Sequence, residues 1–287
     1  RSLQSDRYPI RIIGFAKLVG DLIDGIEVVS VFFAISALIA TLILYLYTRD
    51  ARSTALLVGA ALLGVLWLLG MLKLCGYVLN PYSVLVPFLV FAIGLSHGAQ
   101  KMNGIMQDVG RGTHRYVAAR YTFRRLFVAG LTALLTNAFA FAVMLVIDIP
   151  AIRDLAITTS IGVVILIFTK LILIPVALSY IGVGEKAARR SLERGSASGE
   201  KGLLGTVWEK IGHCSEPRYA IPLVVAAIGL GIASFAISHA YLQIGDLDAG
   251  APELRPDSRY NQDVAYINAH YRISGDQFAV ITATGPE

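Results

Sequence analysis

The sequence predicts an all-α polytopic membrane bundle with six transmembrane helices. Of its 287 residues, 55% are hydrophobic and only 16% are charged, a balance too apolar for an ordinary soluble domain. The apolar residues also collect in runs of roughly 20, the length that crosses a bilayer as a helix. Polar links separate these runs, so we expect the chain to pass through the membrane repeatedly.

Six runs have the length and composition of spans. They cover residues 26–48, 53–72, 82–102, 126–147, 155–181 and 220–240. Before them, residues 8–25 place apolar side chains at helical spacing with most charges off that face, which predicts an amphipathic helix at the membrane interface. Residues 184–218 are rich in charge, glycine and serine, so we expect a linker there.

The last segment, residues 241–287, turns soluble. A helical pattern occupies 258–271, and QFAVITAT at 277–284 has the β-branched and aromatic content of a strand. So short a segment buries too little surface to fold alone. We therefore expect the chain to be part of a larger protein, interrupted inside an extracytoplasmic domain.

The basic residues predict the orientation, because cytoplasmic loops retain Lys and Arg. One set of links holds Arg49, Arg52, an arginine cluster at 111–125 and the basic residues of 184–218, whereas the opposite set holds only Lys73 and Arg153. The first set is expected in the cytoplasm, with both chain ends in the periplasm of a bacterial inner-membrane protein.

The same topology constrains cysteines and partners. It places Cys75 and Cys214 on opposite sides of the membrane, so no disulfide is expected between them. The net charge of +5 sits in loops rather than in a stripe or an arm, so no nucleic-acid partner is predicted. The sequence lacks the GxxxxGK[ST] phosphate loop, metal-ligand spacings and nucleophile–base signatures. We expect no cofactor, no metal and no enzymatic activity.

The most unusual stretch is 87–106, PFLVFAIGLSHGAQKMNGIM, where polar residues interrupt an apolar run. Ionisable groups inside a membrane span are costly and are functional candidates by default. His97, with Ser96 beside it, is either a proton-relay group or a neutral histidine bonded to neighbours such as Ser96 and Gln100. Gly94 and Gly98 have GxxxG spacing, which favours close helix packing.

Three further polar residues lie in the fourth and fifth spans. Lys170 either snorkels towards the cytoplasmic interface or pairs with an acid from another part of the transporter. Thr136 and Asn137 either hydrogen-bond between helices or join a proton path.

Five arginines between the third and fourth spans have near-helical spacing, which predicts a short helix on the membrane surface. We expect them to fix topology and to contact anionic lipid headgroups. They are Arg111, Arg115, Arg120, Arg124 and Arg125.

Several segments in fixed order carry a family resemblance. They are AIGLSHG at 92–98, the arginine-bearing helix ending at Arg125, LTALLTNAFAF at 131–141, IPAIRDLA at 149–156, Ile161-Gly162 and LIPVAL at 173–178. Together they resemble the resistance-nodulation-division (RND) exporters, within the MmpL-like and hopanoid-exporter-like branch.

The resemblance implies an architecture. Residues 1–25 would be a periplasmic lead-in helix, and 26–183 would match the second to sixth spans of a twelve-span transporter, similar to a sterol-sensing domain. Residues 184–218 would be the cytoplasmic linker, and 219–240 would open the second repeat. Residues 241–287 would begin an α+β, ferredoxin-like porter domain.

One position departs from the family pattern. Members commonly place an aspartate, often followed by tyrosine, in the span that matches 87–106, and this carboxylate is implicated in proton relay. Gly98 and Ala99 occupy those positions here. The usual acid is therefore missing, and His97 lies one residue earlier, about 100° around the helix.

The predicted function is proton-motive-force-driven export of a hydrophobic or amphiphilic substrate, with a lipid as one candidate. The expected partners are that substrate, membrane lipids, the remainder of the same transporter, and a homo-oligomer or periplasmic accessory protein. The alternative is a sterol-sensing-like lipid receptor or accessory protein without transport activity. A structural assembly factor is a third reading, and it predicts no bound lipid.

Overall fold

The computed structural model describes residues 10–78, 80, 83–195, 211–214, 216–242, 250–252 and 254–271. These residues are helical or irregular, and no strand occurs among them. The helices are α1 (Phe15–Thr48), α2 (Ala51–Leu74), η1 (Ser83–Leu85), α3 (Val86–Gly110), α4 (Arg115–Val143), η2 (Met144–Val146), α5 (Pro150–Leu166), η3 (Ile167–Leu173), α6 (Ile174–Ile181), α7 (Glu185–Gly195), α9 (Pro217–Tyr241) and α10 (Arg259–His270). The strand predicted at 277–284 lies outside the described residues.

Six helices among the described residues are long and apolar enough to cross a membrane, which confirms the predicted number of spans. They are Phe15–Thr48, Ala51–Leu74, Ser83–Gly110, Arg115–Val146, Pro150–Ile181 and Pro217–Tyr241. The helical pattern predicted at 258–271 is likewise present as α10, whose N-cap Ser258 accepts a hydrogen bond from the backbone N–H of Asn261.

Two predicted surface helices do not exist as separate elements. The lead-in helix predicted at 8–25 is wrong in its bounds, because α1 begins at Phe15 after Gly14, whose φ is +113°, and continues unbroken into the first span. The surface helix predicted at 111–125 is also wrong, because α3 runs to Gly110 and α4 starts at Arg115. Nothing between Arg115 and the apolar span breaks the helix, so the arginines extend it.

The predicted linker also contains structure that its composition did not indicate. Its first part forms α7, and Ala187 and Ala188 on that helix are buried. The backbone N–H of Gly184 donates to Asp50 Oδ2 at 3.2 Å, which ties the start of α7 to the turn between α1 and α2. The glycine- and serine-rich part, 196–210, lies outside the described residues.

The chain divides into two compact units, Arg1–Val31 with Phe235–Glu287, and Phe32–Ser234. In the first unit, Asp263 of α10 accepts hydrogen bonds from Arg11 Nη1 at 3.0 Å and from the backbone N–H of Ile12 at 3.4 Å. The Arg11 guanidinium also lies over the Tyr266 ring, 3.6 Å from its centroid. The segment before α1 is therefore attached to the helix that follows the sixth span.

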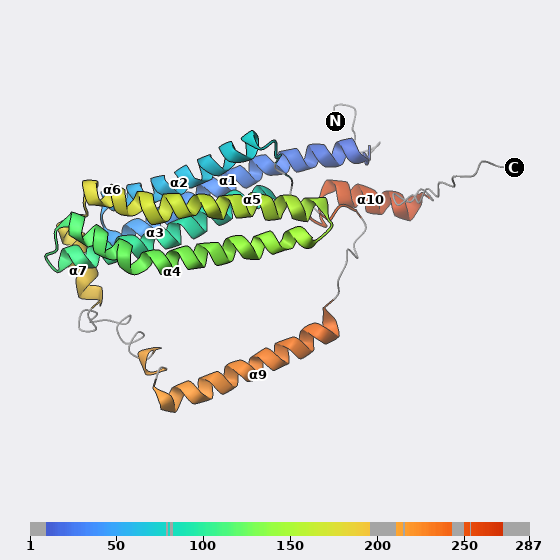
Figure 1. The fold of residues 1–287 in the computed structure, drawn as a ribbon. Coiled ribbons are helices and arrows are strands. Elements are labelled where there is room, and N and C mark those ends of the chain that lie inside the picture. Colours follow the sequence, from blue (N-terminus) through green and yellow to red (C-terminus); the bar gives the residue numbers. More distant parts are fainter. Residues whose placement is uncertain are drawn as a thin grey trace. The chain divides into compact units, whose positions relative to one another are not determined.

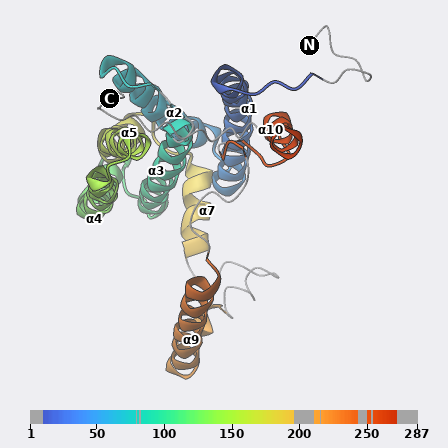
Figure 2. The same cartoon turned by 90° about the vertical axis from the view of Figure 1, so that its right-hand side faces the viewer.

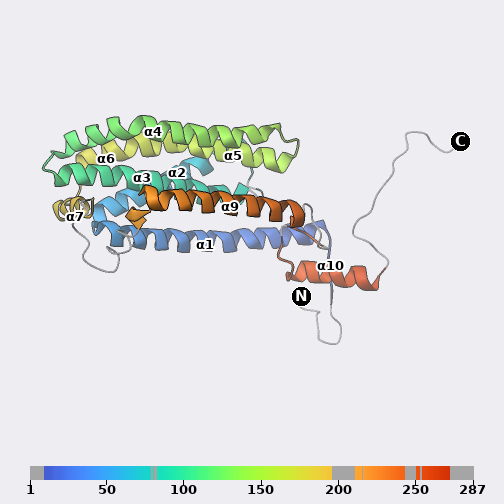
Figure 3. The same cartoon turned by 90° about the horizontal axis from the view of Figure 1, so that it is seen from below.

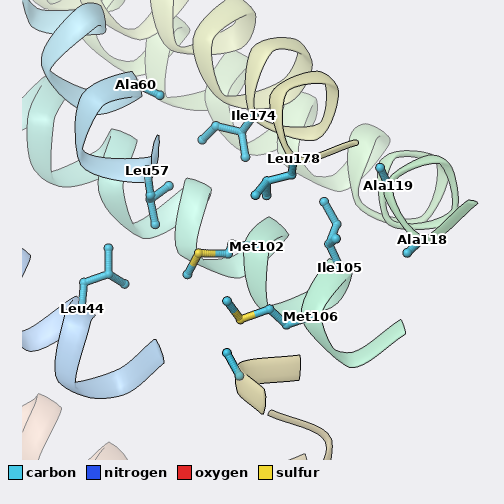
Figure 4. Close-up of a cluster of buried hydrophobic side chains, with 11 residues drawn as sticks. Leu44, Leu57, Ala60, Met102, Ile105, Met106, Ala118, Ala119, Ile174 and Leu178 are labelled. Atoms are coloured by element: carbon cyan, nitrogen blue, oxygen red, sulfur yellow. The ribbon is translucent and has the colours of Figure 1, made fainter. Parts of the chain in front are cut away.

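The second unit holds the bundle. In Figure 1, α2, α5 and α4 run lengthwise beside one another, and Figure 3 shows α3 in the same direction. Viewed end-on in Figure 2, α3 lies between α4 and α1. One buried apolar cluster joins α3 to its neighbours through Met102, Ile105 and Met106, which face Leu57, Ile174 and Leu178 (Figure 4). This packing fixes the inner face of α3, where the candidate site lies.

Candidate functional site

The fifth span changes its helical form where it carries its lysine. Regular α5 ends at Leu166, a π-helix, η3, covers Ile167–Leu173, and α6 resumes at Ile174 with Pro175 in its first turn. Proline lacks the backbone N–H that would bond the carbonyl four residues earlier, and its ring crowds that carbonyl. The turn before Pro175 therefore cannot keep regular hydrogen bonds, and π-helical turns of this kind recur at functional sites.

The π-helix directs Lys170 into the bundle. Its side chain is 0% exposed, and Nζ has no hydrogen-bond partner among the described residues. Lys170 therefore does not snorkel to an interface, which was one of the two predicted alternatives. A buried, unpaired ammonium is expensive inside a membrane protein, so a residue kept in that position is a strong functional candidate.

A second lysine, Lys101 of α3, is buried beside the first. Its exposure is 2%, and it meets the neighbour of Lys170 at Gly130 of α4. A Cβ added to Gly130 would lie 2.8 Å from Leu171 Cδ2 and 3.2 Å from Lys101 Nζ. None of the salt bridges in the described part of the chain involves either lysine. The bundle thus holds two adjacent bases without a described counter-charge.

His97 completes this group, which we call the lysine site: His97, Lys101 and Lys170. His97 lies one helical turn before Lys101 on α3, and the two interact electrostatically. Its Nδ1 is buried without a partner in the described residues. Ser96 does not provide one, because its hydroxyl donates to the Ile93 carbonyl at 3.0 Å.

Glycines allow the lysines to approach the helix backbones. A Cβ added to Gly94 would lie 2.8 Å from Lys170 Cε, and one added to Gly130 of α4 would lie 3.2 Å from Lys101 Nζ. At Gly98 an added Cβ would collide with Leu57 Cδ1 and lie 2.8 Å from Ile174 Cδ1. Real Cβ atoms essentially never come within 3.0 Å of such atoms, so Gly94 and Gly98 both lie at close helix contacts, as their spacing predicts.

The other two predicted relay residues lie on α4 and share no described hydrogen bond with the lysine site. Thr136 is exposed on α4, and Asn137 is half-buried. No hydrogen bond of either side chain is among those described. A polar link between α4 and α5 comes instead from Ser160, whose hydroxyl donates to the Ala138 carbonyl at 3.2 Å.

The arginines gather at the end of the bundle that also carries the turn between α1 and α2 and helix α7. We call it the basic end. Here Asp108 of α3 is 7% exposed and accepts hydrogen bonds from Arg111 Nη1 at 3.0 Å, Thr122 Oγ1 at 3.3 Å and Arg125 Nη2 at 3.3 Å. Arg115, Arg120 and Arg124 are exposed on α4. Arg125 therefore joins Thr122 in holding α4 to α3, whereas Arg111 pairs with Asp108 from the end of α3 itself.

An apolar groove lies on the opposite face of α3 from the lysine site. Its volume is about 550 Å³, and α1 and α3 line it, with Phe33, Ala40, Leu44, Phe88, Ala92 and Ala99 among the lining residues. Phe33 packs edge-to-face on Phe88 and Phe91, with centroids 4.8 and 5.5 Å away, at one end of the groove. Such a groove suits an acyl chain or another apolar molecule.

Sequence reasoning missed two important residues. Lys101 was visible as a polar interruption of 87–106 but was not weighed as a candidate, although it lies at i+4 from His97 on one helix face. Asp108 was not considered, because it follows the predicted end of the third span. An acid spaced three residues before Arg111 was the available signal.

These features define the class of protein. It is a multi-pass helical membrane protein with ionisable side chains enclosed in its bundle. No group of three His, Cys, Asp or Glu residues placed to hold a metal ion occurs in the described residues.

The model of the MMPL family matches residues 3–222, and the chain belongs to that family. Membership places it among the RND-type membrane transporters of hydrophobic substrates and confirms the resemblance seen in the sequence. No curated protein and no solved structure matches the chain.

Proposed function

We propose that the protein exports a hydrophobic or amphiphilic substrate from the bacterial inner membrane and that the proton-motive force drives this export. The single observation that carries the proposal is the lysine site. Lys170 is enclosed at 0% exposure without a partner in the described part of the chain, and a second lysine beside it is 2% exposed. This arrangement favours a group that gains and loses a proton over one that stays charged.

The proposed coupling is electrostatic. With both lysines neutral, α3 and η3 pack closely through Gly94. When one neutral amine takes up a proton, the resulting ammonium group needs hydration or a counter-charge, and a second proton adds repulsion between the lysines. Either change favours an arrangement in which α3 and η3 separate. His97, in electrostatic contact with Lys101, is placed to pass protons to the pair.

The experiment is efflux of a fluorescent amphiphile from cells that make the full-length protein, with and without a protonophore. Lys170→Met keeps an unbranched side chain of similar length but removes the titratable group. We expect it to reduce protonophore-sensitive efflux to the level of cells without the protein. Lys73→Met is the matched control, because Lys73 is exposed near the end of α2.

A Lys170→Met protein whose efflux still stops with protonophore and otherwise equals wild type contradicts the proposal. His97→Ala tests the histidine separately from the lysines. If the His97→Ala protein transports normally, the histidine is not part of the relay, and the result for Lys170→Met still decides the role of the lysines.

A second function, lipid reception without transport, is favoured by the groove between α1 and α3. A receptor would bind lipid there and show no gradient-dependent efflux. Wild-type efflux that is indifferent to protonophore, together with lipid retained by the purified protein, supports this alternative over the exporter.

A further inference from the structure

The apolar groove extends along α1 and α3 as one continuous strip. On α3 it follows Phe88, Ala92, Ser96 and Ala99, a helical repeat that continues at Asn103. From Phe33 to Tyr47 it follows α1 for about 21 Å at roughly 1.5 Å per residue. One leaflet contains about 15 Å of hydrocarbon, half of the roughly 30 Å core, so the groove is long enough for a lipid chain from one leaflet.

The groove ends at polar side chains. Tyr47 lines both the apolar groove and a small pocket that it shares with Arg190 and Ser191 of α7. Its hydroxyl donates to Asn103 Oδ1 at 3.2 Å, and the Ser191 hydroxyl donates to the same oxygen at 2.7 Å. An apolar channel that leads to a cluster of hydroxyl and guanidinium groups matches an amphiphile with an anionic head.

The position of Arg190 is fixed by the packing of α7. Ser191 bonds to α3, Gly184 bonds to Asp50, and a Cβ on Gly110 would lie 2.6 Å from the Ala188 carbonyl oxygen, so α7 rests directly on α3. Arg190 is half-buried, and its guanidinium makes no salt bridge within the part of the chain that the structure describes. It is an oriented cation at the mouth of an apolar groove.

We propose that this groove binds one acyl chain of an anionic glycerophospholipid from the leaflet at the basic end, with the lipid phosphate against Arg190 and Tyr47. The pocket between these residues has room for about one water molecule, at about 10 Å³, so the phosphate lies over its mouth. The occupant is a lipid rather than a free phosphate, because only a lipid also covers the apolar strip. The guanidinium supplies a charge-assisted, two-pronged donor to phosphate oxygens.

The proposal deepens the proposed function by assigning a lipid site, and it is tested without a proton gradient. Phosphatidylglycerol is titrated into the detergent-solubilised full-length protein, and bound lipid is counted by native mass spectrometry. We expect one lipid that is retained more tightly than the rest. Arg190→Gln should weaken its binding about tenfold, the effect of losing a hydrogen bond to a charged group. Arg189→Gln removes the same charge from the exposed side of α7 and should change binding less than about twofold.

Bulky substitutions that fill the groove test the part of the proposed site that binds the acyl chain. Ala92 lines the groove and is exposed, so Ala92→Trp adds bulk there without displacing core side chains, and we expect it to abolish retention of the tight lipid. Ala99→Phe gives a second test about two helical turns further along. Glycerol phosphate, which has the head but no chain, should not compete.

Four outcomes overturn the proposal. Equal losses in Arg190→Gln and Arg189→Gln indicate general attraction of lipid to a basic surface. Retention of the tight lipid in a folded Ala92→Trp or Ala99→Phe protein places the lipid elsewhere, and competition by glycerol phosphate indicates an anion site without a lipid. If wild type retains no lipid, another part of the transporter covers the groove. Because binding needs no gradient, failure of the efflux experiment leaves this result unaffected.

Discussion

Single residues set how closely the helices of the lysine site approach. Gly94 faces Lys170 and Gly130 faces Lys101, so each lysine stem rests against a backbone that has no Cβ. Gly98 lies at the neighbouring contact of α3 with α2 and α6, where Leu57 and Ile174 fill the space that a side chain would need. Interiors are close-packed, so an added methyl group at such a position must displace its neighbours. The glycines are therefore as much a part of the site as the bases.

Gly98→Ala should destabilise the bundle. Its new methyl group would collide with Leu57, and overpacking of this kind costs about 1–3 kcal/mol. We expect a lower midpoint in thermal unfolding of the detergent-solubilised protein. Gly59→Ala is the matched control, because no atom of the described residues lies within 4 Å of the added Cβ and alanine has the higher helix propensity. Equal midpoints for Gly98→Ala and wild type would refute the close contact.

At the level of whole helices, the sequence predicts which segments span the membrane better than it predicts where the helices end. The spans were predictable because hydropathy and length directly reflect the bilayer, and all six are present. Their ends were not, since α3 and α4 continue as helices through polar residues that the hydropathy pattern excludes. The π-helix η3 was also not predictable. Pro175 signals an irregularity, but the direction in which Lys170 then turns depends on packing against α3.

For the same reason, the lysine site was predicted only in part. His97 and Lys170 stood out as ionisable residues in apolar runs. That they meet, and that Lys101 joins them, depends on the register of α3 against η3, which no single-helix pattern contains. Thr136 and Asn137 looked equivalent in sequence, but Thr136 is exposed on α4 whereas Asn137 is half-buried.

Asp108 should stabilise the packing of α3 against α4 at the basic end. Asp108→Asn removes the charge that accepts hydrogen bonds from two arginines and Thr122. The arginines are about half-exposed, so solvent screening reduces the loss, and we expect destabilisation of about 1–2 kcal/mol in chemical unfolding. Asp148→Asn is the control, because that carboxylate is 90% exposed, and its pair with Arg153 should contribute nothing measurable. Equal losses of stability in Asp108→Asn and Asp148→Asn would contradict this role of Asp108.

At the scale of the whole molecule, charge is distributed along the membrane normal. The turn between α1 and α2, the Asp108 cluster and α7 all belong to the basic end, and the Gly184–Asp50 hydrogen bond joins two of them. The opposite ends of the spans carry few basic residues, among them Lys73 and Arg153. Positive charge in short loops favours retention in the cytoplasm, so this asymmetry predicts which end faces it.

The two cysteines test this orientation directly. Cys75 follows α2 at the end opposite the basic end, Cys214 precedes α9, and both are exposed. Three candidate spans, α3, α4 and the run from α5 to α6, separate them, so we expect them on opposite sides. We expect a membrane-impermeant maleimide to label Cys75 in intact spheroplasts and to label Cys214 only after the membrane is opened.

Substitution to serine identifies which thiol reacts. Cys75→Ser should abolish labelling of intact spheroplasts, whereas Cys214→Ser should leave it unchanged. Labelling of Cys214 alone from outside would mean that the basic end faces outward, against the charge rule. Labelling of both from the same side would mean that an even number of crossings separates them. If one of the three spans did not cross, the membrane would lose α3, α4 or the fifth span, and with it the enclosure of the lysines on which proton coupling depends.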